Sequence, residues 1–414
     1  MSRYKDTREL IVGLDIGTSK ILAIVAEVSP EVGLEVIGMG SHPSRGLKKG
    51  VVVNIESSVS AIQRALEEAE LMAACKIREV YTGIAGSHIK SFNSHGMVPI
   101  KDKEVSQLDV DRVIETARAV NIPTDQQILH ILHILPQEYL VDGQEDVREP
   151  LGMSGVRLEV KVHIVTGAVS AAQNIIKCVR RCGLEVRDLV LQPLASALAV
   201  LTEDEKDLGV ALVDIGGGTT DIAVFTQGAI RHTAVIPIAG DQITNDIALA
   251  LRTPLKDAED IKIAHGCALR QLAGAHDMVE VPGVGERGPR QLSRQTLAEV
   301  IEPRVLELYE LVQAELRRSG FEELMRSGIV ITGGSAAMQG MVDLGEEVFH
   351  MPVRLGLPQY TGGLSEMMRN ARFATGVGLL LAGMDQQDRH QPMKFSGSSV
   401  KQILERMRGW FKNF

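Results

Sequence analysis

The sequence Asp-Ile-Gly occurs twice in this chain, each time after a short apolar run and shortly before a threonine. The first copy, residues 13–20, reads Gly-Leu-Asp-Ile-Gly-Thr-Ser-Lys, and the second, residues 212–221, reads Leu-Val-Asp-Ile-Gly-Gly-Gly-Thr-Thr-Asp. An apolar strand, a tight glycine turn and a second apolar strand predict a β-hairpin in each copy. Two such turns, facing each other from duplicated halves of the chain, suggest a nucleotide held in a cleft between them.

The residue types in these turns suit a phosphate group. Glycine lets the backbone approach a ligand closely, and successive N–H groups then form a cradle for an anion, helped by threonine and serine hydroxyls. We therefore predict phosphate contacts from Gly17, Thr18, Ser19, Lys20, Gly216, Gly217, Gly218 and Thr219. The carboxylates of Asp15 and Asp214 are predicted to hold a hydrated Mg²⁺ through water. The alternative is that these are ordinary glycine hairpins that bind nothing.

A third glycine turn follows the buried-type strand at residues 329–332. It reads Gly333, Gly334, Ser335 and Ala336, and a helix is predicted to begin near residue 337. Glycines at such a turn bring the backbone close to a base or a phosphate, although a plain strand-to-helix turn would look the same.

Three further polar side chains are candidates for the same cleft. Glu259 and Lys262 stand at i, i+3 on a predicted helix over 256–264, so they share one face; they either grip a ribose and an adenine edge or form a solvated ion pair. Gln192 follows a predicted strand and could orient a water on a terminal phosphate, or could be an ordinary polar residue at a helix start. If the nucleotide is hydrolysed at all, Gln192 and Asp214 are the candidate catalytic residues.

The order of the three turns resembles the actin, Hsp70 and sugar-kinase superfamily. That resemblance implies an α/β, actin-like duplicated ribonuclease-H-type fold, with two domains around a nucleotide cleft and an inserted small α+β domain. It also implies ATP and Mg²⁺ as ligands, with Glu259, Lys262 and residues 333–336 around the adenosine. A length of 414 residues agrees with two domains.

Composition excludes some classes of protein. The net charge of −9 argues against nucleic acid as a partner, because phosphate backbones need basic surface. Four cysteines show no disulfide framework, and Cys178 and Cys182 are interpreted as small core residues rather than a metal pair. Residues 1–10 are polar, and no apolar run reaches the roughly 20 residues of a membrane span. We therefore expect a cytoplasmic protein.

The last fifteen residues carry a different pattern. Residues 400–414 place apolar side chains at helical spacing, with basic residues at the borders of that face. The apolar set is Val400, Ile403, Leu404, Met407, Trp410, Phe411 and Phe414, and the basic set is Lys401, Arg406, Arg408 and Lys412. Such a helix is typical of one that lies in an anionic membrane surface. The alternative is a helix packed on its own domain or on a partner.

Several stretches resemble the bacterial cell-division actin family FtsA. They are residues 44–46, 136–139, 152–157, 232–237, 298–304 and the terminal helix. The resemblance implies an ATP-binding protein with weak or variable hydrolysis that polymerises with itself and binds the carboxyl-terminal peptide of the tubulin-like FtsZ. It would tether FtsZ peripherally to the inner face of the cytoplasmic membrane at the septum, and would recruit later divisome proteins. The alternatives are a PilM-like pilus-assembly platform, which shares the fold, and an ordinary phosphotransferase.

The same resemblance suggests how the chain divides into parts. We predict a first core domain from 1–85, 165–206 and 372–385, interrupted by an inserted domain at 86–164. A second core domain is predicted from 207–244 and 306–371, with a partner-binding subdomain at 245–305. A linker at 386–399 and the membrane helix at 400–414 are predicted to follow. Basic residues in the partner-binding subdomain are expected to steer the FtsZ peptide: Arg287, Arg290, Arg294 and Arg304.

Overall fold

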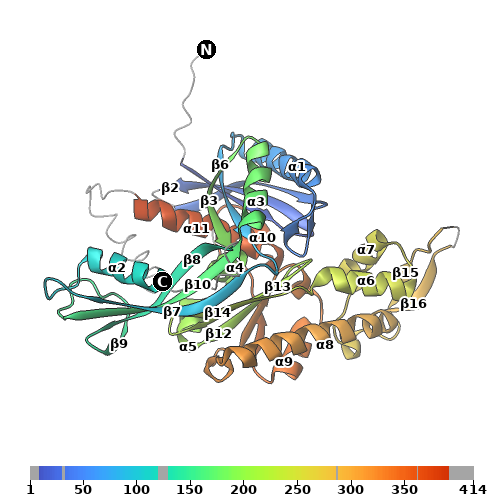
Figure 1. Cartoon of the computed structure of the whole chain (residues 1–414). Coiled ribbons are helices and arrows are strands. Elements are labelled where there is room, and N and C mark those ends of the chain that lie inside the picture. Colours follow the sequence, from blue (N-terminus) through green and yellow to red (C-terminus); the bar gives the residue numbers. More distant parts are fainter. Residues whose placement is uncertain (1–8, 30–32, 120–128, 286–287, 361, 391–414) are drawn as a thin grey trace, which may run out of the picture.

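Two five-stranded sheets with the same strand arrangement form the body of the molecule (Figure 1). The computed structural model describes residues 9–29, 33–119, 129–285, 288–360 and 362–390. The first sheet has the order β11-β6-β1-β2-β3 and the second β14-β13-β12-β17-β18. In each, an antiparallel meander of three strands is extended by two parallel strands, so the predicted duplicated α/β fold is confirmed.

The strands of the two sheets occupy corresponding places. The first sheet consists of β1 (Leu10–Ile16), β2 (Lys20–Ser29), β3 (Gly33–Pro43), β6 (Glu79–Ile84) and β11 (Glu185–Leu191). The second consists of β12 (Val210–Ile215), β13 (Thr220–Thr226), β14 (Ala229–Ile236), β17 (Ile329–Thr332) and β18 (Val353–Leu355). Their central strands are almost wholly buried, as expected for sheets covered on both faces.

Helices cover the outer faces and fill the space between the sheets. Apolar residues of α1 (Ile55–Ala73) and α3 (Val169–Arg181) pack on the outer face of the first sheet, and those of α8 (Arg294–Ser319) and α9 (Met341–Phe349) on the second. Between the sheets, α4 (Gln192–Val200) and α11 (Ala374–His390) contribute to one cluster that includes residues of both sheets. The two core domains therefore share one apolar cluster where they meet.

A separate domain is inserted between β6 and α3. Its antiparallel sheet has the order β7-β10-β8-β9, and its helix α2 covers one face. The elements are β7 (Lys90–Pro99), α2 (Gln107–Arg118), β8 (Leu129–Val141), β9 (Gln144–Val147) and β10 (Arg157–Ala168). Although its chain connections are to the first domain, its sheet contacts β14 of the second: Ser91 Oγ donates to Thr233 O at 3.0 Å and Gln137 Nε2 to Ile230 O at 2.7 Å.

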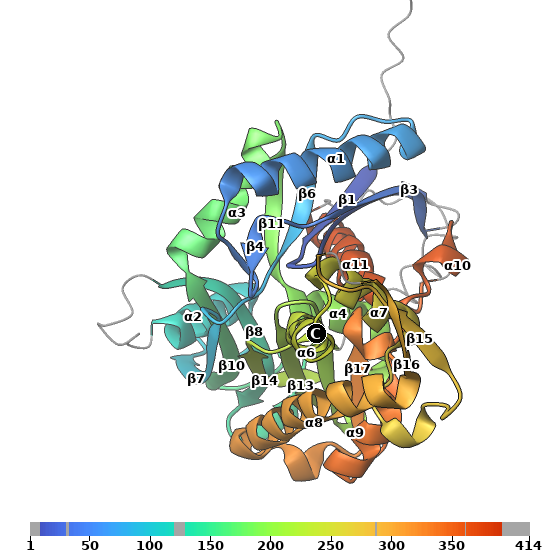
Figure 2. The same cartoon turned by 90° about the vertical axis from the view of Figure 1, so that its right-hand side faces the viewer.

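A small subdomain lies at the opposite end of the molecule from the insert (Figure 1). It contains α6 (Gly240–Leu251), α7 (Leu255–His265), β15 (Met278–Val281) and β16 (Arg290–Ser293). Figure 2 shows the same subdomain approaching the viewer, in front of the second sheet. The remaining named elements are short: β4 (Leu47–Lys48), β5 (Val51–Val52), α5 (Glu203–Leu208) and α10 (Ser365–Met368).

Two local expectations can be compared with the structure. The helix predicted to begin near residue 337 begins at Met341, because a 3₁₀ turn over Ser335–Ala337 is followed by extended backbone and by Gly340 at a φ of +82°. Cys182 Sγ donates to the carbonyl of buried Cys178 at 3.3 Å, and both are free thiols, as expected for core residues.

The described residues contain neither a membrane-spanning helix nor a cluster of metal-binding side chains. Within them, no helix is long and apolar enough to span a membrane. The same residues contain no group of three or more histidine, cysteine, aspartate or glutamate side chains suited to holding a metal ion.

Candidate functional site

The two glycine turns have the same backbone geometry. In the first, the Gly17 N–H donates to the Lys20 carbonyl at 3.0 Å, and in the second, the Gly216 N–H donates to the Thr219 carbonyl, also at 3.0 Å. Each turn joins two antiparallel strands, β1 to β2 and β12 to β13. The two predicted hairpins are therefore present, and they repeat one local design in the two halves of the chain.

The turns also meet each other. A β-carbon added at Gly217 would lie 2.8 Å from Cβ of Ser19, and one added at Gly218 would lie 2.7 Å from Oγ1 of Thr18. Real β-carbons do not approach other atoms so closely, so only glycine allows this contact. The structure thus brings the first and second predicted phosphate turns to one place between the domains.

Asp15 stands at the end of β1, beside a basic and an amide side chain. Lys20 Nζ lies 3.0 Å from Oδ2 of Asp15, and Gln192 Nε2 donates to Oδ1 at 3.4 Å. The Asp15 side chain is 8% exposed and the Lys20 side chain 21% exposed, so the pair is partly desolvated. Three of the predicted site residues, drawn from β1, β2 and the start of α4, are therefore in direct contact.

Asp214 occupies the corresponding position at the end of β12 and is buried. Ser196 Oγ donates to its Oδ2 at 2.5 Å, and Thr375 Oγ1 donates to the same atom at 3.3 Å. Burial raises the pKa of Asp214, the Ser196 hydrogen bond opposes that shift, and the charge of Asp15 adds to it. A β-carbon on Gly333 would lie 2.4 Å from Asp214 Oδ1, so the third glycine turn directly covers this carboxyl.

Asp221 belongs to the same cluster, although it was not among the candidates chosen from sequence. It pairs directly across the sheet with Asp214, and its Oδ2 accepts a hydrogen bond from Thr219 Oγ1 at 3.0 Å. Its Oδ1 is buried without a hydrogen-bond partner among the described residues. Burial and then the charge of Asp214 raise the pKa of Asp221 to about 8. The hairpin register across the glycine turn could have indicated this pairing, because strands that begin beside a short turn have a fixed register.

The residues predicted to surround the adenosine lie beside the second turn. Lys262 Nζ contacts Oε2 of Glu259 at 2.7 Å and donates to the Gly240 carbonyl at 3.0 Å. Ser335 Oγ donates to the Gly216 carbonyl at 2.8 Å. Because the Lys262 side chain is only 10% exposed, the pair is not a solvated surface ion pair. The third turn thus contacts the second turn directly, and α7 contacts Gly240, whose N–H donates to the Gly216 carbonyl at 3.1 Å.

Each predicted partner arginine within the described residues is held by its own subdomain or by the neighbouring helix. Arg290 donates to the Leu251 carbonyl. Arg294 donates to the His265 carbonyl at 2.9 Å and to Gln339 Oε1 at 2.6 Å. Arg304 donates to both carboxylate oxygens of Asp246, at 2.6 and 3.1 Å. These side chains therefore have structural contacts of their own. Arg287, residues 391–399 of the linker predicted at 386–399, and all of residues 400–414 lie outside the described residues. Residues 386–390, predicted as the start of that linker, belong to helix α11 (Ala374–His390).

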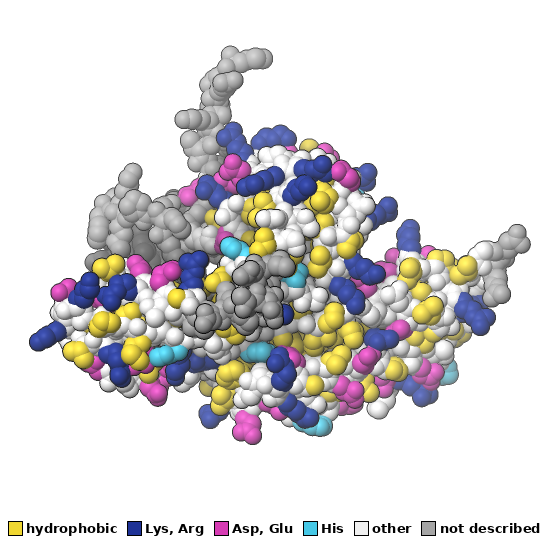
Figure 3. Space-filling view, viewed as in Figure 1, with side chains coloured by type: hydrophobic (Ala, Val, Ile, Leu, Met, Phe, Trp, Pro, Cys, Tyr) yellow, Lys and Arg dark blue, Asp and Glu magenta, His cyan; other side chains and the backbone are white. Residues whose placement is uncertain are grey.

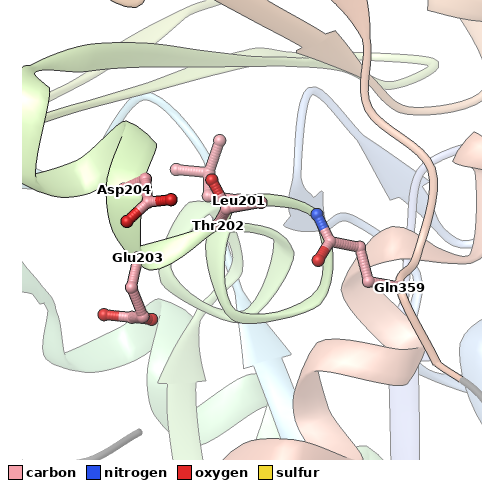
Figure 4. Close-up of a pocket in the computed structure, with 5 residues that line it drawn as sticks. All are labelled: Leu201, Thr202, Glu203, Asp204 and Gln359. Atoms are coloured by element: carbon pink, nitrogen blue, oxygen red, sulfur yellow. The ribbon is translucent and has the colours of Figure 1, made fainter.

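A surface hollow elsewhere in the molecule contains none of the predicted site residues. Figure 4 shows it at the connection between α4 and α5, where it is lined by Leu201, Thr202, Glu203, Asp204 and Gln359. The candidate site is therefore defined by contacts between the three turns, not by this hollow.

Comparison with solved structures places the fold in the actin-like class. A PilM–PilN complex of type IV pilus biogenesis aligns with a TM-score of 0.65 and 18% identity, covering 90% of this chain and 98% of that one. MreB 5 of Spiroplasma citri bound to AMPPNP aligns with a TM-score of 0.55 and 16% identity, covering 93% and 98%. At such identities the likeness concerns the fold alone.

Comparison of sequences identifies the family. The family model described as Cell division protein FtsA matches residues 211–378, and that of the SHS2 domain inserted in FtsA matches residues 86–166. Cell division protein FtsA of Pseudomonas aeruginosa is 62% identical over 408 residues, which cover 97% of each chain, and that of Escherichia coli K12 is 48% identical over 414 residues, covering 98% of each. The chain belongs to the FtsA family of cell division proteins.

Proposed function

We propose that the cleft between the two core domains binds ATP with Mg²⁺. The observation that carries this proposal is the contact of two equivalent glycine turns, each following a buried aspartate, at the junction of the duplicated halves. The turns would hold the phosphates through their N–H groups, that of Thr219 included, and through the Thr18 and Ser19 hydroxyls, while Lys20 supplies positive charge. Glu259 and Lys262, with the third turn, would surround the adenosine.

The carboxylates fit a hydrated divalent cation. Asp15 and Asp214 offer oxygen atoms, the ligands that Mg²⁺ prefers, and water molecules would complete its coordination. Bound there, Mg²⁺ would neutralise phosphate charge. Gln192, whose amide donates to Asp15, would orient a water, and we propose at most weak hydrolysis.

The experiment that tests the nucleotide site is Gly217→Val. The added side chain would overlap Ser19 and keep the turns apart, so the variant should lose ATP binding measured by calorimetry. Gly288→Val is the matched control, because a β-carbon at Gly288 meets nothing within 4 Å. Unchanged ATP affinity in a folded Gly217→Val variant would contradict the proposal.

We further propose that the protein assembles into filaments that tether FtsZ to the inner face of the cytoplasmic membrane at the division septum and recruit later division proteins. Membership of the FtsA family and the actin-like fold support this role, as does the basic amphipathic sequence at 400–414. Burying four large apolar side chains of that segment is worth about 1.5–3 kcal/mol each before ordering costs. One tail would bind reversibly, and a filament with many tails would bind far more tightly.

The membrane proposal is tested by Trp410→Glu with Trp410→Leu as control. We expect the charged variant to stay in solution when anionic vesicles are sedimented, and the leucine variant to pellet as the parent does, while both keep ATP affinity. If the charged variant pelleted as well as the parent, the tail would instead be a helix that packs on its own domain or on a partner protein.

The FtsZ peptide is proposed to dock on the subdomain at 245–305. Leu249 on α6 is 78% exposed there, and would suit a peptide of mixed acidic and apolar character. Leu249→Glu should weaken binding of the peptide, measured by fluorescence anisotropy. Leu71→Glu on distant α1, where the leucine is 84% exposed, should not. Equal effects of the two variants would remove the subdomain from the peptide site.

A further inference from the structure

A short hairpin formed by β4 and β5 has an unusual turn. Leu47 pairs with Val52 and Lys48 with Val51, leaving a two-residue turn of Lys49 and Gly50. Lys49 has a φ of +51° and Gly50 a φ of +76°, so both are left-handed, as in the turn favoured by tight hairpins. The first of these positions usually takes Asn, Asp or Gly, and a lysine there is strained. Strained backbone in native structures gathers at functional sites.

The hairpin is fixed against the first phosphate turn. The Gly50 N–H donates to Thr18 Oγ1 at 3.0 Å, and ahead of the hairpin the Ser44 N–H donates to the Ser19 carbonyl at 2.9 Å. Thr18 Oγ1 is also the atom that a β-carbon on Gly218 would meet at 2.7 Å. The tip of the hairpin therefore reaches the point where the two phosphate turns meet.

The hairpin and the two residues before it carry three exposed cations. Arg45, Lys48 and Lys49 are exposed, and none of them forms an ion pair within the described part of the chain. Other cations close to the site, such as Lys20, are paired with a carboxylate. Figure 3 shows charges of both signs interspersed over the face it presents. Three neighbouring like charges repel one another, and an anion placed among them would relieve that repulsion.

We propose that this basic hairpin, residues 45–52, is a third wall of the phosphate site, and that Lys48 and Lys49 favour nucleoside triphosphate over diphosphate. The inference rests on the proposed nucleotide function. A nucleoside triphosphate carries one more phosphate than a diphosphate, and that group needs additional positive charge close to the two turns. Lysine suits this role because its ammonium is a compact charge on a long flexible stem.

The test compares two double variants with the same change in charge. Lys48→Gln/Lys49→Asn removes the charge from the hairpin and keeps a residue that tolerates a left-handed backbone. Lys101→Gln/Lys103→Asn is the matched control in the insert, where both lysines are exposed and Lys103 has a φ of +59°. ATP and ADP affinities are measured by calorimetry with Mg²⁺ at low and moderate salt.

The hairpin variant should weaken ATP binding about tenfold while changing ADP binding much less. The control variant should change neither the ATP affinity nor the ADP affinity. Lys49→Gly should reproduce part of the effect without lowering the melting temperature, because glycine fits the turn better than lysine. An unchanged ratio of ATP to ADP affinity, in a parent that binds both, would overturn the inference alone. If the hairpin variant instead loses only its binding to anionic vesicles, the hairpin faces lipid and the inference is wrong. A parent that binds neither nucleotide would overturn the proposed function as well.

Discussion

His163 is a buried histidine at the contact between the inserted domain and the second core domain. Its Nδ1 lies 2.7 Å from Asn93 Oδ1 and its Nε2 lies 3.0 Å from Thr233 Oγ1. Because the amide oxygen of Asn93 can only accept, Nδ1 carries a proton and donates to it, whereas the Thr233 hydroxyl is able both to donate to Nε2 and to accept from it. Burial, and next the charge of His232, lower the pKa of His163 to about 3.

The lowered pKa of His163 predicts how far the free energy of unfolding falls when the solution is made acidic. In the unfolded chain a histidine titrates near 6.5, so the unfolded state binds a proton between pH 6.5 and pH 3 that the folded state excludes. The stabilisation is fully present above pH 6.5 and is lost as the pH falls below it. At about 1.4 kcal/mol per pH unit, moving from pH 7 to pH 5 should cost about 2 kcal/mol of unfolding free energy.

The measurement is urea unfolding at pH 7 and pH 5, followed by circular dichroism. His163→Gln should be less stable than the parent at pH 7, but should lose about 2 kcal/mol less on acidification. His95→Gln is the control, because His95 is on the same sheet but its side chain is 46% exposed and lies 2.9 Å from Glu159. If the parent and the His163→Gln variant lost the same free energy between the two pH values, the reasoning from burial would be refuted.

Three further outcomes are expected. Gly378→Ala should destabilise the protein by about 3 kcal/mol, seen as a lower melting temperature, because the new β-carbon would lie 1.7 Å from the Ala195 carbonyl oxygen; an unchanged melting temperature would contradict this packing. Tyr309→Phe should cost about 1–2 kcal/mol in denaturant unfolding, since it removes a buried hydrogen bond of 2.9 Å to the Met341 carbonyl, and a smaller loss would mean that the carbonyl finds another donor. Asp214→Asn should abolish the Mg²⁺ dependence of ATP affinity without lowering the melting temperature, and a retained Mg²⁺ dependence would place the cation elsewhere.

The local features of the site could be predicted from sequence, because short-range patterns determine them. A glycine turn between two apolar runs fixes a hairpin, and the alternation of buried residues fixes its register. The turns at 17–20 and 216–219 were predictable for that reason. The predicted helix start after the third turn was wrong by about one turn, because Gly340 at a positive φ begins a new helix after a 3₁₀ turn.

The contacts between distant segments could not be predicted in the same way. No periodicity in the sequence shows that Gly218 meets Thr18, or that the insert, which interrupts the first domain, contacts β14 of the second. The charge of an arginine is visible in sequence, but its partner is not: Arg304 was chosen for a peptide and is paired with Asp246. Such pairings depend on the packed arrangement of whole elements, which local propensity does not encode.

The helix that closes the first domain is the last one described in the chain. A β-carbon on Gly13 in β1 would lie 2.9 Å from the Gly376 carbonyl of α11, and Val377 and Leu380 belong to the same apolar cluster as Ile11. During synthesis, the inner face of β1 therefore remains uncovered until α11 has left the ribosome, long after the insert and the second domain are complete. The amphipathic segment at 400–414 emerges directly after that helix. A growing chain thus gains its proposed means of membrane attachment only when its first domain is able to close.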